Sequence, residues 1–273
     1  MMQYKWCVCD MDGTLLNSED AISKENEIAL KELQQKGVEV IIASGRVDLM
    51  VKRFIKQLDL KGHVISCNGG LIRNIETGKI LYSKQMDKVV VRGIIDYCMD
   101  SSIDFLLYTT SIVYSSRNNP RAEKYEGLNK VLSEDLQISI KYIDKESIEM
   151  VNELDTLKIL LVCNNHEEVK LLETKFSKYD SLTVVSSANG VLDIMASNTS
   201  KGKALKILSD MQAVDLNKVI AFGDNYNDME MFQCVGMPIA VDNAVEVLKL
   251  QSKYVTRSND ESGIAYAINN FIL

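Results

Sequence analysis

The residues best suited to chemistry lie at the end of the first apolar segment of the chain. Asp10 and Asp12 follow apolar residues 4–9, and Gly13 and Thr14 come directly after them. Clustered carboxylates at the end of an apolar strand repel one another and resist desolvation, and a divalent cation removes that conflict. The pair is therefore a candidate metal site. A solvated turn, with Gly13 supplying the bend, is the structural alternative.

A second acidic cluster follows the apolar segment 219–222. The run GDNYND, residues 223–228, again places two carboxylates, Asp224 and Asp228, at the expected end of a strand. This cluster is a second candidate for chemistry at a strand end. The alternative is a polar loop in which Asn227 or Asp228 caps the helix that follows.

Two further clusters contain groups that bind anions. Ser44, Gly45 and Arg46 combine a hydroxyl group, a flexible backbone and the start of a predicted helix, where backbone N–H groups attract anions. An N-cap serine followed by glycine is the alternative there. Lys201 and Lys203 stand at the start of another predicted helix, and a solvated lysine is the alternative for that cluster.

The elements that must position these clusters alternate between strand and helix. In the first third of the chain, we expect strands at residues 4–9, 38–43 and 63–67. Helical spacing of apolar residues predicts helices between them. The last third of the chain returns to the same alternation and includes a predicted helix at residues 243–250. This pattern favours a parallel sheet with right-handed crossovers, in which ligands bind at the carboxyl ends of the strands. Residues 10–12, 44–46 and 68–70 all follow predicted strands, so we expect a site there.

The middle third of the chain has a different pattern. After a predicted hairpin at residues 71–85, helices and strands follow one another in a mixed α+β order, without the regular alternation of the flanking thirds. We therefore expect an α/β protein with two domains. Residues 1–83 and 192–273 would form the core domain, and residues 84–191 would form an inserted second domain.

Taken together, the four clusters resemble the motifs of the haloacid dehalogenase superfamily, and in particular those of the Cof-type hydrolases. The matching segments are DMDGTLL (10–16), IIASGR (41–46), SKGKAL (200–205) and GDNYND (223–228). Their order and spacing fit over almost the whole chain, and the insertion lies between the second and third motifs. The resemblance implies a Rossmann-like parallel-sheet core with an inserted α+β cap domain that closes over the site and reads the leaving group.

By this resemblance, Asp10 is the nucleophile and Asp12 is the general acid and base. Asp10 would attack phosphorus in line and form an aspartyl-phosphate, which divides one difficult displacement into two easier ones. Asp12 would protonate the leaving oxygen and then activate the hydrolytic water. An aspartate at this second position indicates phosphate-ester chemistry, because ATPase relatives carry threonine there.

The resemblance also implies a magnesium cofactor. Its protein ligands would be the Asp10 carboxylate, the Asp12 backbone carbonyl and the Asp224 carboxylate, with water and a phosphate oxygen completing an octahedral shell. Asn227 and Asp228 would support this metal shell. The ion would screen the repulsion between the nucleophile and the anionic substrate and would stabilise the transition state.

The remaining motif residues are assigned by resemblance to the substrate phosphate. Ser44 and Gly45 match the phosphate-binding second motif. Lys201, rather than the neighbouring lysine, matches the lysine of the third motif, which neutralises the phosphate and orients the nucleophile. Arg46 would face the site or form a structural salt bridge, and Asn68 would contact phosphate or only shape its loop.

The composition excludes several classes of protein. A net charge of −7 disfavours nonspecific nucleic-acid binding, which needs a surplus of lysine and arginine. No apolar run approaches the ~18 residues that span a bilayer, and the N-terminus has no signal-peptide pattern, so we expect a cytoplasmic protein without membrane contact. The six cysteines are scattered and predict free, packed thiols, and the two histidines do not support a zinc site.

The expected partner is a small phosphorylated metabolite, such as a sugar phosphate, and the chain would act as a monomer or a small homo-oligomer. No motif in the inserted domain identifies the substrate. Arg117, Arg121, Lys124 and Tyr125 could form an anion-binding surface there or simply a solvated helix face. A phosphomutase of the same superfamily and a non-catalytic sensor of phosphometabolites are the alternative functions.

Overall fold

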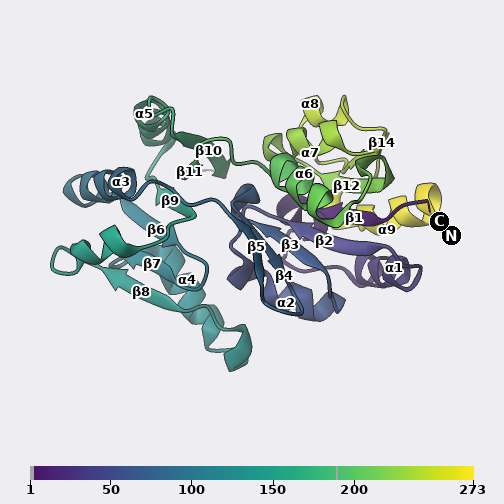
Figure 1. Cartoon of the computed structure of the whole chain (residues 1–273), viewed down its shortest axis with the longest axis horizontal. Helices are drawn as coiled ribbons and strands as arrows, with labels where there is room; N and C mark the ends of the chain where they lie inside the picture. Colours follow the sequence, from purple (N-terminus) through teal and green to yellow (C-terminus); the bar gives the residue numbers. More distant parts are fainter. Residues whose placement is uncertain (1–2, 189) are drawn as a thin grey trace. The chain divides into compact units, whose positions relative to one another are not determined.

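The apolar segments of the first and last thirds of the chain form one mainly parallel sheet. In a computed structural model, which describes residues 3–188 and 190–273, eight strands follow the order β14-β13-β12-β1-β2-β3-β4-β5 (Figure 1). The pairs from β14 to β3 are parallel, and β4 is antiparallel to β3. The strands are β1 (Trp6–Cys9), β2 (Glu39–Ala43), β3 (His63–Ser66), β4 (Leu71–Asn74), β5 (Ile80–Ser83), β12 (Val219–Gly223), β13 (Met237–Ala240) and β14 (Tyr254–Val255).

Both faces of this sheet are buried, which explains why its central strands are continuously apolar. Successive residues of a strand point to opposite faces. Cys7 therefore belongs to one hydrophobic cluster with Leu30 of α1, and Val8 belongs to another with Leu205 of α6. The helices of this part of the chain are α1 (Lys24–Gln35), α2 (Asp48–Leu58), α6 (Lys201–Gln212), α7 (Met229–Cys234), α8 (Glu246–Lys249) and α9 (Gly263–Ala267).

The middle of the chain forms a second sheet of six strands in the order β10-β11-β9-β6-β7-β8. One face of this sheet packs against α3 and α5, through residues such as Phe105, Ile95 and Leu172. The elements are α3 (Lys88–Asp100), β6 (Asp104–Tyr108), β7 (Val113–Ser116), α4 (Pro120–Asn129), β8 (Ile140–Ile143), β9 (Lys158–Val162), α5 (His166–Phe176), β10 (Leu182–Ala188) and β11 (Val191–Ala196).

The chain divides into two compact units. The first consists of Met1–Arg46, Val51–Tyr82 and Ser200–Leu273, and the second of Val47–Met50 and Ser83–Thr199. The expected division at residue 192 falls inside β11, which pairs with β9 and β10 and so belongs to the second unit. Residues 1, 2 and 189, which belong to the expected segments 1–83 and 84–191, lie outside the described residues.

The α/β fold with a parallel-sheet core is confirmed, and most expected elements form within a few residues of their predicted ends. Ser23 is the N-cap residue of α1, because its hydroxyl group accepts a hydrogen bond from the backbone N–H of Asn26 at 3.2 Å. The helix expected at residues 243–250 was predicted too long: α8 covers only Glu246–Lys249, because the Asn243 side chain makes tertiary contacts instead. Within the described residues, no helix has the length and apolarity needed to cross a membrane.

Candidate active site

The two acidic clusters lie at one edge of the sheet, because they follow the neighbouring parallel strands β1 and β12. Cys9 at the end of β1 pairs with Phe222 of β12, so Asp10 and Asp224 follow adjacent strand ends. The backbone N–H of Asp10 extends this pairing by donating to the Phe222 carbonyl at 3.0 Å. One carboxylate oxygen from each of Asp10, Asp224 and Asp228 lies within 4.8 Å of the others. The structure therefore groups three of the acidic residues singled out in the sequence.

Lys201 is the cation of this cluster. It is the first residue of α6, its side chain is completely buried, and its ammonium group donates to Asp10 Oδ1 and to Asp228 Oδ1, the latter at 2.8 Å. The hydroxyl group of Ser200 caps the same helix by accepting from the backbone N–H of Lys203. The structure thus brings Lys201 to these carboxylates.

Asp228 shapes its own loop and faces the cluster, whereas its side chain makes no capping hydrogen bond to α7, the helix that follows. Its Oδ2 accepts hydrogen bonds from the backbone N–H groups of Asp224 (3.1 Å) and Asn225 (3.2 Å), while Oδ1 accepts from Lys201. A Cβ atom at Gly223 would lie 2.7 Å from the Asp228 carboxyl carbon, so only glycine fits there. Because both Asp228 oxygens are engaged by the protein, this residue is suited to orienting its neighbours.

Asp12 does not join the buried carboxylates. Its side chain is 60% exposed, and the guanidinium group of Arg46 holds it through Nε to Oδ2 at 3.0 Å and Nη2 to Oδ1 at 2.5 Å. The turn at the end of β1 therefore directs Asp10 inward and Asp12 outward. Arg46 also bonds to Asp20 at 2.5 Å, so it contacts a candidate catalytic residue and forms a salt bridge as well.

The second motif and the Asn68 loop meet beside the acidic cluster. Ser44 is buried, and its Oγ accepts a hydrogen bond from the backbone N–H of Arg46 at 3.0 Å. Asn68 adopts a left-handed conformation with φ of 52°, and its backbone N–H donates to the Ser44 carbonyl at 3.0 Å. The Asn68 side-chain oxygen accepts from Asn227 Nδ2 at 3.1 Å, which joins this loop to the GDNYND segment. A Cβ atom at Gly45 would lie 3.0 Å from the same oxygen, so the loops are closely packed.

The electrostatics of the cluster favour the binding of a cation. Burial, reinforced by the charge of Asp228, raises the pKa of Asp10 well above its ordinary value, against the opposing effect of Lys201. Burial and Asp228 likewise raise the pKa of Asp224. Burial lowers the Lys201 pKa, but the two carboxylates outweigh it and the pKa is raised. The three carboxylates lie close together and only two of them bond to the Lys201 ammonium group. Carboxylate oxygens are ligands that magnesium prefers, so the residues fit this ion.

Two residues to which the sequence assigned no role support the site. The hydroxyl group of Thr14 donates to Asp224 Oδ1 at 2.9 Å, and the Asn243 side chain donates to the Gly13 carbonyl at 2.7 Å. Thr14 belongs to the first motif, so the motif itself was the available signal. Asn243 stands at the start of the helix predicted at residues 243–250, and nothing in the sequence marked it as a residue of the site. Gly13 has φ of +77°, and a Cβ atom there would lie 2.5 Å from Asp224 Oδ2. Glycine is therefore the residue that fits where the loop after β1 packs against Asp224.

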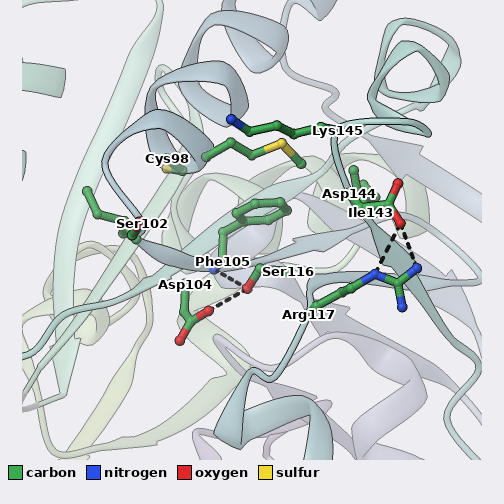
Figure 2. A pocket seen from close by; sticks show the side chains of 11 residues that line it. Cys98, Ser102, Asp104, Phe105, Ser116, Arg117, Ile143, Asp144 and Lys145 are labelled. Atoms are coloured by element: carbon green, nitrogen blue, oxygen red, sulfur yellow. Dashed lines mark hydrogen bonds and ion pairs between the residues drawn. The ribbon is translucent and has the colours of Figure 1, made fainter.

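The second unit contains a separate cavity of about 300 Å³. Figure 2 shows Phe105 at this cavity and the Arg117 guanidinium group paired with Asp144, at 2.6 Å from Nη2 to Oδ2. Arg117 precedes α4, so it does not lie on the helix face with Arg121 and Lys124. The Ser116 hydroxyl group donates to Asp104 at 2.8 Å. This cavity brings together none of the residues of the acidic cluster.

The fold and the acidic cluster define an α/β protein with a candidate site at the carboxyl ends of its strands. The family described as haloacid dehalogenase-like hydrolase matches residues 7–268. The chain is 31% identical over 284 residues to 5-amino-6-(5-phospho-D-ribitylamino)uracil phosphatase YwtE of Bacillus subtilis, covering 98% of both chains. It is 30% identical over 285 residues to phosphatase YwpJ of the same organism, covering 98% of this chain and 100% of the relative.

A solved structure agrees with this assignment. The crystal structure of a haloacid dehalogenase-like hydrolase from Bacteroides thetaiotaomicron superposes with a TM-score of 0.86 at 28% identity, covering 97% of this chain and 98% of that one. The chain belongs to the haloacid dehalogenase-like hydrolases. The resemblance drawn from the four motifs is confirmed, and so is the prediction of an enzyme of the phosphatase class within this family.

Proposed function

We propose that this enzyme is a magnesium-dependent phosphatase that hydrolyses phosphate monoesters of small metabolites through an aspartyl-phosphate on Asp10. The observation that carries the proposal is the group of Asp10, Asp224 and Asp228 at the ends of β1 and β12, in which the buried Asp10 and Asp228 both bond to Lys201 and Asp224 is half-buried. A buried carboxylate beside a fixed ammonium group and a cation-binding cluster is suited to attack on an anionic substrate. We also expect the enzyme to act in the cytoplasm as a monomer or small homo-oligomer.

Magnesium would be held by the carboxylates of Asp10 and Asp224 and by the backbone carbonyl of Asp12. When bound, the ion neutralises phosphate charge and stabilises the transition state. Asp228 would keep Lys201 and the Asp224 loop in place, since both of its oxygens are committed to them. Thr14 would orient the Asp224 carboxylate by donating to Oδ1.

The proposed chemical steps take the roles of the two aspartates from the resemblance to the family. A carboxylate oxygen of Asp10 attacks phosphorus, the bond from phosphorus to the ester oxygen breaks, and the leaving oxygen takes a proton from Asp12. In the second step Asp12 removes a proton from water, the water oxygen attacks phosphorus, and the bond to Asp10 breaks. Inorganic phosphate is released and Asp12 is again protonated.

Ser44, Gly45 and Lys201 are proposed to bind the transferred phosphoryl group. The Ser44 Oγ already accepts from the Arg46 backbone, so its hydroxyl hydrogen can donate to a phosphate oxygen. Lys201 reduces the negative charge at Asp10, which lowers the repulsion that the incoming phosphate meets. Asn68 and Asn227 bond to one another and are proposed to hold the loops around this position.

The substrate class is proposed from the relatives. The phosphatase YwtE of Bacillus subtilis is described as acting on 5-amino-6-(5-phospho-D-ribitylamino)uracil, which is a phosphate monoester of a small metabolite. We propose the same broad class for this chain, with sugar phosphates included. The second unit, which consists of Val47–Met50 and Ser83–Thr199, is proposed to recognise the leaving group.

The proposal is tested by measuring release of inorganic phosphate from a panel of phosphorylated metabolites, with magnesium or with a chelator. The expected result is release that needs magnesium and is lost in Asp10→Asn. Asp59→Asn is the matched control, since Asp59 is an exposed aspartate of the same unit. Release of phosphate by Asp10→Asn would overturn the mechanism. Transfer of phosphate to a second hexose hydroxyl, in place of release, would indicate a phosphomutase, and binding without turnover would indicate a sensor.

A further inference from the structure

We propose that Asp20 and Arg53 are positioning residues for Asp12 and that they act through Arg46. Neither residue belongs to the motifs that define the family resemblance, and neither lies in the buried carboxylate cluster. The proposal rests on the role of Asp12 as proton donor and acceptor given above. It extends the site from the sheet edge into the segment after the first motif and into α2.

The Asp12 side chain is not held in place by burial. Its side chain is 60% exposed, and its carboxylate is held by two donors of one Arg46 guanidinium group. A two-point contact of this kind fixes the direction of a carboxylate as well as its distance, because the guanidinium group is planar and its donors are rigidly placed. The orientation of Asp12 therefore depends on what holds Arg46.

Asp20 holds Arg46 from the other side. Asp20 Oδ1 accepts from Arg46 Nη2 at 2.5 Å, the same nitrogen that bonds to Asp12. Asp20 Oδ2 accepts from Arg53 Nη2, also at 2.5 Å. The four side chains form a row of alternating charge, from Asp12 through Arg46 and Asp20 to Arg53, in which each inner group is held on both sides.

The far end of this row is anchored to α2. Arg53 is an α2 residue, and its guanidinium carbon lies 4.3 Å from the centre of the Phe54 ring, a distance at which cation and ring attract each other. Phe54 is buried in the hydrophobic core. Asp20 is thereby connected to a rigid element, and that connection reaches Asp12 through Arg46.

The backbone at Asp20 is shaped to present its carboxylate. Asp20 has φ of 58°, a left-handed conformation that is uncommon for non-glycine residues but that aspartate adopts more readily than most. The side chain of Asn17 maintains this turn by accepting from the backbone N–H groups of Glu19 and Ala21 at 3.1 and 3.0 Å. The turn held by Asn17 therefore places the Asp20 carboxylate where it bonds to both Arg46 and Arg53.

The test uses Asp20→Asn, because asparagine tolerates the left-handed conformation and keeps the shape of the side chain while removing its charge. Asp59→Asn is the control: Asp59 also has a positive φ, of 51°, and is exposed. For each variant, kcat/KM is measured on two substrates in magnesium. One is p-nitrophenyl phosphate, whose leaving group needs no proton, and the other is the alkyl phosphate that the wild-type enzyme hydrolyses best.

If Asp20 positions the proton donor, Asp20→Asn lowers kcat/KM for the alkyl phosphate by about 10-fold and leaves that for p-nitrophenyl phosphate within about 2-fold. Asp12→Asn should show the same preference with a larger loss. Arg53→Met should reproduce the selective loss, and the double variant Asp20→Asn/Arg53→Met should lose no more than Asp20→Asn alone, because both residues act through Arg46.

An equal loss on both substrates, or no difference from Asp59→Asn, would overturn the inference, because a merely structural role does not depend on the leaving group. The Arg53→Met result keeps the test decisive if Asp20→Asn does not fold. Failure of the proposed function has a different signature: the wild-type enzyme would release no phosphate, or Asp10→Asn would retain activity.

Discussion

Replacing Lys201 with methionine tests whether the buried cluster is organised by a single ammonium group. Lys201 is completely buried and bonds to Asp10 and Asp228, which are themselves buried. Methionine fills similar space but leaves the carboxylates without a cation. Removing one partner of a buried ion pair costs about 3–5 kcal/mol. At roughly 2–4 °C per kcal/mol for a protein of this size, the apparent Tm in chelator should fall by about 6–20 °C.

The assay is thermal unfolding of wild type and variant in chelator at several pH values. The loss should be larger at pH 8 than at pH 5, because Asp10, whose pKa is already raised, takes up a proton at low pH and relieves the repulsion. Lys206→Met, at an exposed lysine of the same helix α6, is the matched control. A Lys201→Met protein as stable as the Lys206→Met protein at pH 8 would refute this reasoning.

Two further predictions concern the metal site. Thr14→Val removes the hydroxyl group that donates to Asp224 Oδ1 at 2.9 Å, so magnesium affinity should fall by about 10–100-fold in a calorimetric titration, and unchanged affinity would contradict this role of Thr14. In chelator, the folded protein binds protons at Asp10 and Asp224 more tightly than the unfolded chain does, because the pKa values of both groups are raised in the fold. The resulting stabilisation is complete below the ordinary aspartate pKa of ~4 and is lost as the pH rises through the raised pKa values. The Tm of the metal-free protein should therefore decline between pH 5 and pH 8. Saturating magnesium should remove most of this slope, and a Tm that rises over the range in chelator would contradict the assignment.

The sequence predicted those parts of the fold that depend on local patterns. Continuous apolar segments such as β1 and β12 are recognisable because both sides of a parallel strand are buried, and α1 is marked by its N-cap serine. The two-residue strand β14 carries too little pattern to be recognised. The start of α8 was placed too early, because Asn243 bonds to Gly13, more than two hundred residues away in the chain.

In the candidate site, too, the residues within motifs could be predicted from the sequence, and the contacts between residues far apart in the chain could not. The motifs identified Asp10, Asp224, Asp228 and Lys201, which the structure brings together. The spacing of two residues between Asp10 and Asp12 left open whether both side chains converge, and the turn after β1 separates them. Asp12 instead bonds to Arg46, which follows the end of another strand, and the spacing of the two aspartates does not predict that contact.

The ion pair between Asp20 and Arg53 could not be predicted from sequence motifs. Each stands in an ordinary stretch of sequence, and an aspartate between a glutamate and an alanine gives no sign of an ion pair with two arginines. Their relation to Asp12 arises from a left-handed turn and from the placement of α2, which are properties of the folded chain. Positioning residues of this kind become visible only with the structure.

The most direct test of the central claim is detection of the phosphorylated enzyme. Wild-type protein, mixed with an excess of its best substrate and magnesium and quenched in acid, should yield a peptide containing Asp10 that is heavier by the mass of one phosphoryl group. The Asp10→Asn protein should yield no such peptide, and hydroxylamine should remove the phosphoryl group from the wild-type peptide. Phosphate release that persists in Asp10→Asn, with no phosphorylated peptide in either protein, would contradict the assignment of Asp10 as the nucleophile.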